Sequence, residues 1–143
     1  MRPRDRRAIQ TRNGVRMEQL SSGAKQLEST ICHVQPGAGS DGTYSHEGEE
    51  FLYVVTGTLE LWLDEFERYT LRAGDSLWFE STHGHRWYNP SSEETVLLWV
   101  NTPPTLDHTR HRSITTPRRI TTDHDGSRCI QARRSRVRRV RRD

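Results

Sequence analysis

Short runs of alternating apolar and polar residues, separated by turn-forming residues, fill the chain from Gly14 to Asn101. A period of two places successive side chains on opposite faces of a strand, whereas the 3.6-residue period of a helix is hardly seen. We expect strands at residues 14–20, 26–34, 51–55, 58–66, 68–71, 76–80, 85–89 and 95–101. Short strands joined by turns predict an all-β fold, an antiparallel sandwich or barrel that closes its own sheet edges.

Two of the expected strands differ in how much of their surface they need to bury. The run 58–66 has leucine at every second position from Leu59 to Leu63, which indicates one buried face. The run from Phe51 to Val55 has no polar residue, so both of its faces need cover. The core can cover one face, and another sheet or subunit must cover the other. We therefore expect a homodimer.

The two ends of the chain differ from its centre in charge and in apolar content. Residues 1–104 carry 10 Lys and Arg against 15 Asp and Glu, whereas residues 105–143 carry 12 against 4. We expect a flexible basic arm over 1–13, a β-barrel domain over 14–104 and an Arg-rich disordered tail over 105–143, because neither end has a strong apolar pattern. Such a tail can contact nucleic-acid phosphates weakly and without sequence specificity.

Cysteine usage and hydropathy limit where the chain is expected to act. Cys32 and Cys129 lie far apart, which is neither a disulfide framework nor a zinc-binding spacing. No stretch of 18 consecutive apolar residues occurs, and the charged N-terminus is not followed by the apolar segment of a signal peptide. The sequence therefore predicts a cytoplasmic protein that is neither secreted nor inserted in a membrane.

Candidate chemistry gathers around the apolar run 51–55. His46 and Glu50 lie just before this run and are four residues apart. Strand parity therefore turns Tyr44, His46 and Glu50 inward together. The same parity makes His83, His85, Trp87 and Asn89 a second inward set. If the two strands face each other across a barrel, two imidazoles and one carboxylate converge. That set is the ligand type of a facial triad for iron, manganese or a related divalent metal.

A metal is not the only use for these side chains. His46, Glu50 and His85 can also form a hydrogen-bonded polar cluster that binds an organic ligand or satisfies its own members. We interpret His83 as a turn residue and His33 as a histidine packed on its strand. Tyr44, His46, Glu50, His85, Trp87 and Asn89 are the expected lining of a ligand pocket, and His46, Glu50 and His85 are the candidate ligands of Fe, Mn, Zn or Ni.

The segments GTYSHEGEEFLYVVTG and GDSLWFESTHGHRWYN resemble the paired motifs of the cupin family, G-x5-H-x-H-x3,4-E-x6-G and G-x5-P-x-G-x2-H-x3-N. The resemblance implies a small antiparallel double-stranded β-helix, a jelly-roll barrel. It also implies metal-ligand roles for His46, Glu50 and His85. Two positions depart from the motifs, because Tyr44 stands in place of the first histidine and Glu80 in place of the proline.

Residues 8–104 also resemble the C-terminal cupin domain of XRE-type helix-turn-helix regulators, through GVRMEQLS, PGAGS, YSHEGEEFLYV and HRWYNP. That resemblance implies a non-enzymatic domain that senses a small molecule, with no catalytic residues. Thirteen polar residues before the first strand are too few for a helix-turn-helix, so we do not expect sequence-specific DNA binding. The alternative is a small metal-dependent enzyme of the dioxygenase or isomerase type.

Overall fold

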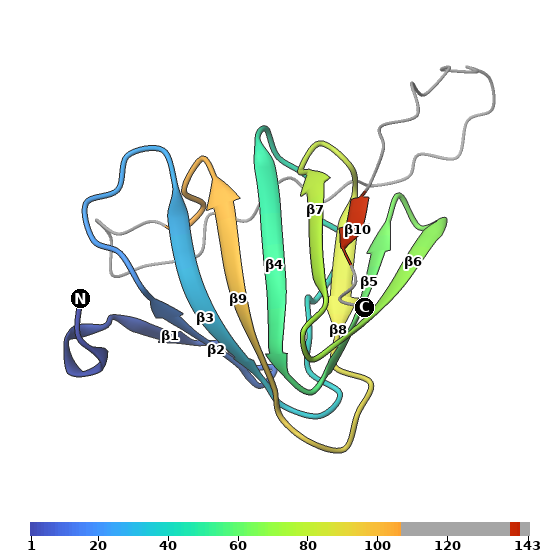
Figure 1. Cartoon of the computed structure of the whole chain (residues 1–143), viewed down its shortest axis with the longest axis horizontal. Coiled ribbons are helices and arrows are strands. Elements are labelled where there is room, and N and C mark those ends of the chain that lie inside the picture. The colour runs from blue at the N-terminus through green and yellow to red at the C-terminus, as the bar shows by residue number, and fades with distance from the viewer. Residues whose placement is uncertain (107–137, 141–143) are drawn as a thin grey trace.

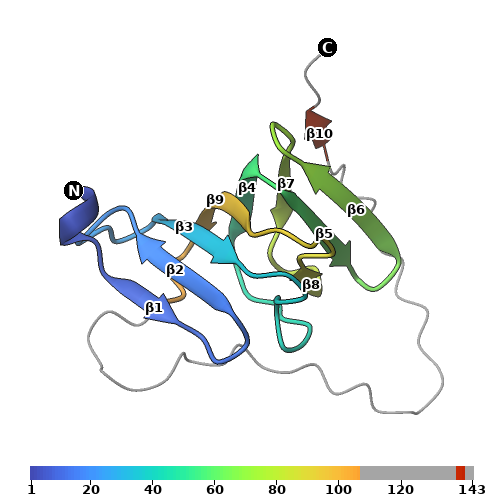
Figure 2. The same ribbon diagram turned by 90° about the horizontal axis from the view of Figure 1, so that it is seen from below.

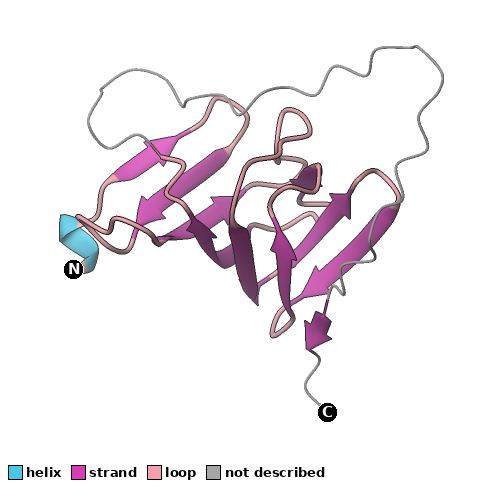
Figure 3. Cartoon of the chain, turned by 90° about the horizontal axis from the view of Figure 1, so that it is seen from above, coloured by secondary structure: helices cyan, strands magenta, loops and turns pink. Residues whose placement is uncertain are grey.

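The computed structural model describes residues 1–106 and 138–140, and these form two antiparallel sheets (Figures 1 and 2). The larger sheet has the strand order β1-β2-β3-β9-β4-β7-β10, and the smaller sheet has the order β6-β5-β8. The only helix among the described residues is one 3-10 turn, Pro3–Asp5 (Figure 3). The strands are β1 Ala8–Gln10, β2 Val15–Gln19, β3 Glu28–Val34, β4 Glu49–Thr56, β5 Thr58–Leu63, β6 Glu67–Arg72, β7 Ser76–Glu80, β8 His85–Tyr88, β9 Thr95–Thr102 and β10 Arg138–Val140.

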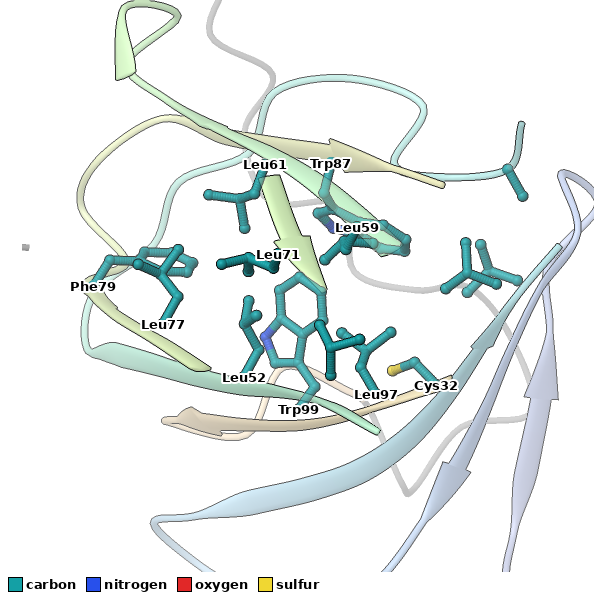
Figure 4. Close-up of a cluster of buried hydrophobic side chains, with 14 of the residues drawn as sticks. Cys32, Leu52, Leu59, Leu61, Leu71, Leu77, Phe79, Trp87, Leu97 and Trp99 are labelled. Atoms are coloured by element: carbon teal, nitrogen blue, oxygen red, sulfur yellow. The ribbon is translucent and has the colours of Figure 1, made fainter. Parts of the chain in front are cut away.

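The strands of the sequence analysis are confirmed as elements, with bounds shifted by a few residues. Alternation of burial follows the expected parity in β4, where Glu50, Leu52 and Val54 are buried. In β3 and β9 every second side chain is buried as well. The inward side chains of both sheets meet in one hydrophobic core, which Figure 4 shows around Leu52, Leu61 and Leu97. Burying these leucines stabilises the fold by about 2 kcal/mol for each side chain.

Residues expected in a flexible basic arm contribute a strand to the larger sheet. β1 pairs antiparallel with β2, and Ile9 lies opposite Met17. The arm interpretation is therefore corrected for Ala8–Gln10. Backbone hydrogen bonds hold an edge strand without any apolar period in its side chains, so the sequence pattern gave no sign of it.

The outer face of β4 is not covered by the described part of the chain. Phe51 is 37% exposed and Val55 is 46% exposed. On the neighbouring strand β9, Leu98 and Val100 point to the same side and are half-buried. The core covers the inward face of the apolar run 51–55, as expected, and the other face remains open to solvent.

Glycine permits the tight turn between β4 and β5. Gly57 has a φ of 84°, which favours glycine, and a Cβ there would lie 2.5 Å from Thr95 Oγ1. Thr95 Oγ1 accepts a hydrogen bond from the backbone N–H of Thr58 at 3.0 Å. The turn thus ties the start of the smaller sheet to β9 of the larger one.

Most of the expected tail, residues 107–137 and 141–143, lies outside the described residues. Its segment β10 pairs with the edge strand β7, so these three residues are part of the larger sheet. No helix in the described part of the chain is both long and apolar enough to span a membrane.

The segment just beyond the expected domain boundary at residue 104 has a structural role. Glu28 is 2% exposed, and its Oε2 accepts hydrogen bonds from the backbone N–H groups of Thr105 and Leu106 at 2.9 and 3.1 Å. A chain ending at Pro104 loses these donors and keeps a buried carboxylate. We expect it to be less stable than a chain ending at residue 109 by about 3 kcal/mol. Urea unfolding of the two truncated chains measures the difference, and equal midpoints and slopes would contradict the role of residues 105–106.

Candidate functional site

Backbone pairing brings the loop before β4 against the start of β8. Tyr44 and His85 exchange backbone hydrogen bonds of 2.9 and 2.8 Å as an isolated antiparallel bridge. The His46 N–H donates to the Ser81 carbonyl at 2.9 Å, and the Ser81 N–H donates to the Gly48 carbonyl at 2.9 Å. This pairing is why side chains from two distant segments of the sequence face one another.

The three side chains named from the sequence as metal-ligand candidates converge. One ligand atom from each of His46, Glu50 and His85 lies within 4.8 Å of the others. Glu50 and His85 are buried, at 4% and 5% exposure, and His46 is half-buried. Glu50 comes from the larger sheet and His85 from the smaller one, so the site joins the two layers.

One oxygen of Glu50 serves both histidines, and the other is held by a tryptophan. Glu50 Oε1 lies 2.6 Å from His46 Nε2 and 3.3 Å from His85 Nε2. Trp99 Nε1–H donates to Glu50 Oε2 at 2.6 Å. Because an indole N–H can only donate, it keeps Oε2 as an acceptor and fixes the plane of the carboxylate.

The other nitrogen of each imidazole faces a backbone carbonyl. His46 Nδ1 lies 2.9 Å from the Glu47 carbonyl oxygen, and His85 Nδ1 lies 2.9 Å from the His83 carbonyl oxygen. A carbonyl oxygen can only accept, so Nδ1 carries the hydrogen in both rings. Both Nε2 atoms are thereby aimed at Glu50, as the second shell of a metal site aims its histidines.

The contacts shift the pKa values of Glu50 and His46. Burial raises the pKa of Glu50, but the hydrogen bonds from His46 and His85 and their positive charge outweigh it and lower the pKa to about 2. The hydrogen bond to Glu50 raises the pKa of His46 above its usual 6.5, against the opposing effect of burial. His46 and Glu50 therefore favour an ion pair in metal-free protein.

The ion pair predicts how the stability of metal-free protein varies with pH. The depressed pKa of Glu50 contributes stability above pH 4.5 that is lost as the pH falls toward 2. The raised pKa of His46 contributes stability below pH 6.5 that is lost as the pH rises through its folded value. We expect the stabilisation by the pair to be greatest between pH 4.5 and 6.5. Urea unfolding from pH 3 to 9 of wild type and His46→Ala tests this, and parallel profiles would contradict it.

The donor set fits a divalent metal of the Fe, Mn, Zn or Ni type. It offers two imidazole nitrogens, whose Nδ1 hydrogens are engaged elsewhere, and one carboxylate oxygen. Tyr44, which stands in place of the first histidine of the motif, directs its hydroxyl to a hydrogen bond with Asp41. His46, Glu50 and His85 would hold such an ion.

The triad lies in the wall of a cavity of about 760 Å³. Of the residues expected to line a pocket, Tyr44, His46, Glu50, His85 and Trp87 do so. The sixth residue, Asn89, is fully buried and does not line the cavity. Its amide nitrogen donates to the carbonyls of Val34 and Glu93 at 2.9 and 2.7 Å, and its Oδ1 accepts from Ser91.

Asn89 is therefore corrected from a pocket residue to a turn-stabilising residue. β8 ends at Tyr88, so strand parity no longer applies at position 89. His83 lies in the turn before β8, as interpreted, with Nδ1 2.5 Å from Asp64 Oδ2. His33 lies on the half-buried outer face of β3, where Nδ1 is 3.2 Å from Glu94 Oε1.

A group of cavity residues on β3 and β9 was not expected from the sequence. Trp99 is among them, and it contacts Glu50 directly. The period of two in these strands could have identified them, because it turns every second side chain of β3 and β9 inward. This holds even in β9, where the sequence is nearly continuously apolar. The missed inward residues that line the cavity are Glu28, Thr30, Cys32, Trp99 and Asn101. Burial raises the pKa of the Cys32 thiol to about 12.

A family model described as the Cupin domain, Cupin_2, matches residues 30–101. This range holds both motif segments and all three members of the triad. The chain belongs to the cupin family. The two packed antiparallel sheets are thus the cupin jelly roll that the motifs implied.

Individual relatives of this cupin have diverse names. "Polyketide synthase CurC" of Streptomyces cyaneus is 32% identical over 93 residues, which are 62% of this chain and 60% of that protein. The chain thus spans about three fifths of that relative's length. A solved cupin from Silicibacter pomeroyi DSS-3, named a sugar phosphate isomerase, is 27% identical with a TM-score of 0.56, over 64% of this chain and 61% of that one.

The Cupin_2 domain of an XRE-family transcriptional regulator from Enterobacter cloacae has the same fold. It is 23% identical with a TM-score of 0.57, over 64% of this chain and 98% of that one. The expected likeness to regulator cupin domains is confirmed at the level of fold.

Proposed function

We propose that this cupin binds a small organic molecule in its cavity without transforming it, as a sensor domain does. The observation that carries the proposal is the triad at the cavity wall, in which Glu50 is bonded by His46 and Trp99 and approached by His85. These polar groups form hydrogen bonds with one another and still lie in the wall of a mostly apolar cavity. A few polar groups in an apolar pocket are typical of a site that orients a small ligand. Tyr44 and Trp87 complete the lining around them.

The proposal is tested by what co-purifies with the protein. Mass spectrometry of the small molecules released on denaturation should find an organic compound with wild type and with His33→Ala, a histidine outside the cavity. His85→Ala should release less of it by about tenfold or more, because it removes one polar anchor. Stoichiometric iron or manganese with no organic compound, together with turnover that Glu50→Ala abolishes, would overturn the proposal in favour of an enzyme.

A metal-dependent enzyme is the second candidate, and one observation favours it. Each imidazole is held at Nδ1 by a backbone carbonyl, so that both Nε2 atoms turn toward one carboxylate oxygen. A bound divalent ion would supply a Lewis acid that polarises a substrate oxygen. The similarity to the solved sugar phosphate isomerase, at 27% identity, further supports the enzyme hypothesis.

Metal titration separates the second candidate from the first. Under the enzyme hypothesis Mn²⁺ should bind wild type and His33→Ala alike at pH 7.5, and about 10- to 100-fold more weakly to His46→Ala. Binding should weaken as the pH falls, because protons compete for the imidazoles. Equal Mn²⁺ affinity of His46→Ala and wild type would exclude the triad as the metal site.

We also propose that a second copy of the chain covers the outer face of β4. Phe51 and Val55 are the exposed apolar residues of that strand, and Leu98 and Val100 of β9 extend the surface. An apolar face of this kind is stabilised by burial against a partner. Sedimentation should give a dimer for wild type and a monomer for Phe51→Glu. A wild-type monomer at all concentrations would contradict the proposal.

A further inference from the structure

The charged side chains around the cavity are unevenly placed. Glu28 and Glu50, at 2% and 4% exposure, lie in its buried wall, and Asp41 lies in an exposed position. Arg12 is the only Lys or Arg among the described lining residues, and it is exposed. The two imidazoles both lie within 3.3 Å of Glu50. The buried part of the cavity therefore has little positive charge to spare for an anionic ligand.

A polar row crosses the larger sheet inside the cavity. In the strand register Glu28 of β3 lies opposite Asn101 of β9, and Asn101 lies opposite Glu50 of β4. All three are at most 6% exposed and line the cavity. Carboxylates accept hydrogen bonds and repel anions, so this row favours a ligand that carries O–H donors.

An aromatic wall adjoins the polar row. Trp99 is the inward residue before Asn101 on β9, and Trp87 reaches it from β8 of the opposite sheet (Figure 4). Their ring centroids are 5.2 Å apart with an interplanar angle of 51°. Both indoles line the cavity, and an aromatic surface of this kind packs well against the ring of a ligand.

Among the described residues that line the cavity, the usual means of binding phosphate are reduced to one exposed arginine, Arg12. Phosphate sites use helix N-termini or forked arginine contacts. The one helix described, Pro3–Asp5, has three residues and does not line the cavity. This is a physical difference from what a phosphorylated sugar would require.

We propose that the ligand is an uncharged ring compound bearing hydroxyl groups, and that phosphate esters are excluded. The inference rests on the proposed small-molecule function and adds the chemical class. The ring packs against Trp87 and Trp99, and hydroxyl groups donate to acceptors of the polar row and the triad. Glu28 discriminates against an anion by repulsion, whereas the charge of Glu50 is offset by its pairing with His46.

Two probes with the same ring system test the class. Binding of dihydroxynaphthalene and of naphthyl phosphate to the full chain is measured by isothermal titration at pH 7.5. We expect the diol to bind at least about tenfold more tightly, because the phosphate meets the buried carboxylate of Glu28. In Glu28→Gln, which keeps an acceptor for Thr105 and Leu106, the phosphate should gain affinity several-fold and the diol should not.

Matched variants assign any effect to the cavity. Glu93→Gln removes the same charge at an exposed position and should leave both affinities unchanged. Trp87→Leu should weaken the diol by about tenfold, whereas Trp62→Leu, on the outer face of β5, should not. Circular dichroism of every variant shows whether it folds, and the comparison of the two probes in wild type needs no variant.

The outcomes distinguish the ligand class from the function. If naphthyl phosphate binds as tightly as the diol, or more tightly, the class is wrong and small-molecule binding stands. If neither probe binds at millimolar concentration, both the class and the cavity as a ligand site are contradicted. Diol binding that Trp87→Leu leaves unchanged would also overturn the inference, because it places the ring outside the cavity.

Discussion

Glu50→Ala is expected to lower the free energy of unfolding by about 3–5 kcal/mol, because it removes the carboxylate that His46, His85 and Trp99 share. His46 loses the partner that raises its pKa, and the Nε1–H of Trp99 loses its acceptor. The substitution should also abolish binding in the cavity. Urea unfolding at pH 6, where the ion pair is complete, measures the loss of stability.

Glu47→Ala is the matched control. Glu47 is exposed and contributes its backbone carbonyl, not its carboxylate, to His46 Nδ1. We expect its unfolding free energy to stay within about 0.5 kcal/mol of wild type. If Glu50→Ala were as stable as Glu47→Ala, the three contacts of Glu50 could not be the interactions that hold the two sheets at the site.

Gly48→Ala is expected to destabilise the fold by about 3 kcal/mol or more and to disrupt the site as well. Gly48 has a φ of 106°, and a Cβ there would lie 1.6 Å from the Thr102 carbonyl oxygen. No rotation of a side chain relieves a clash with backbone. The chain between His46 and Glu50 would have to move away from β9, and these two side chains would lose their alignment.

Gly42→Ala, in the same loop, separates this effect from a general loss of glycine flexibility. Nothing lies within 4 Å of a Cβ at Gly42, and its φ is outside the range that favours glycine. We expect a melting temperature close to that of wild type for Gly42→Ala and a drop of about 10 °C or more for Gly48→Ala. Similar melting temperatures of the two variants would contradict the close approach of Gly48 to Thr102.

The local pattern of the sequence was enough to predict the strands from β2 to β9 and, within most of them, which side chains face inward. A period of two is a property of the backbone, so it holds before any tertiary contact is known. Parity placed Glu50 correctly, but His46 lies in the loop before β4, so its contact with Glu50 depends on the path of the backbone through Gly48. The meeting of this pair with His85 required the motif resemblance, because nothing in either segment alone specifies its partner across the barrel.

The tertiary structure decided which inward residues share the site. The register of β3, β9 and β4 sets Glu28, Asn101 and Glu50 in one row, and a register between strands far apart in sequence is fixed by global packing. Packing likewise brought Trp99 to Glu50 and left Phe51 open to solvent. Asn89 departed from parity because its strand ends one residue earlier, at a turn that its own side chain holds. Side-chain direction is thus determined within a segment, whereas contacts are determined between segments.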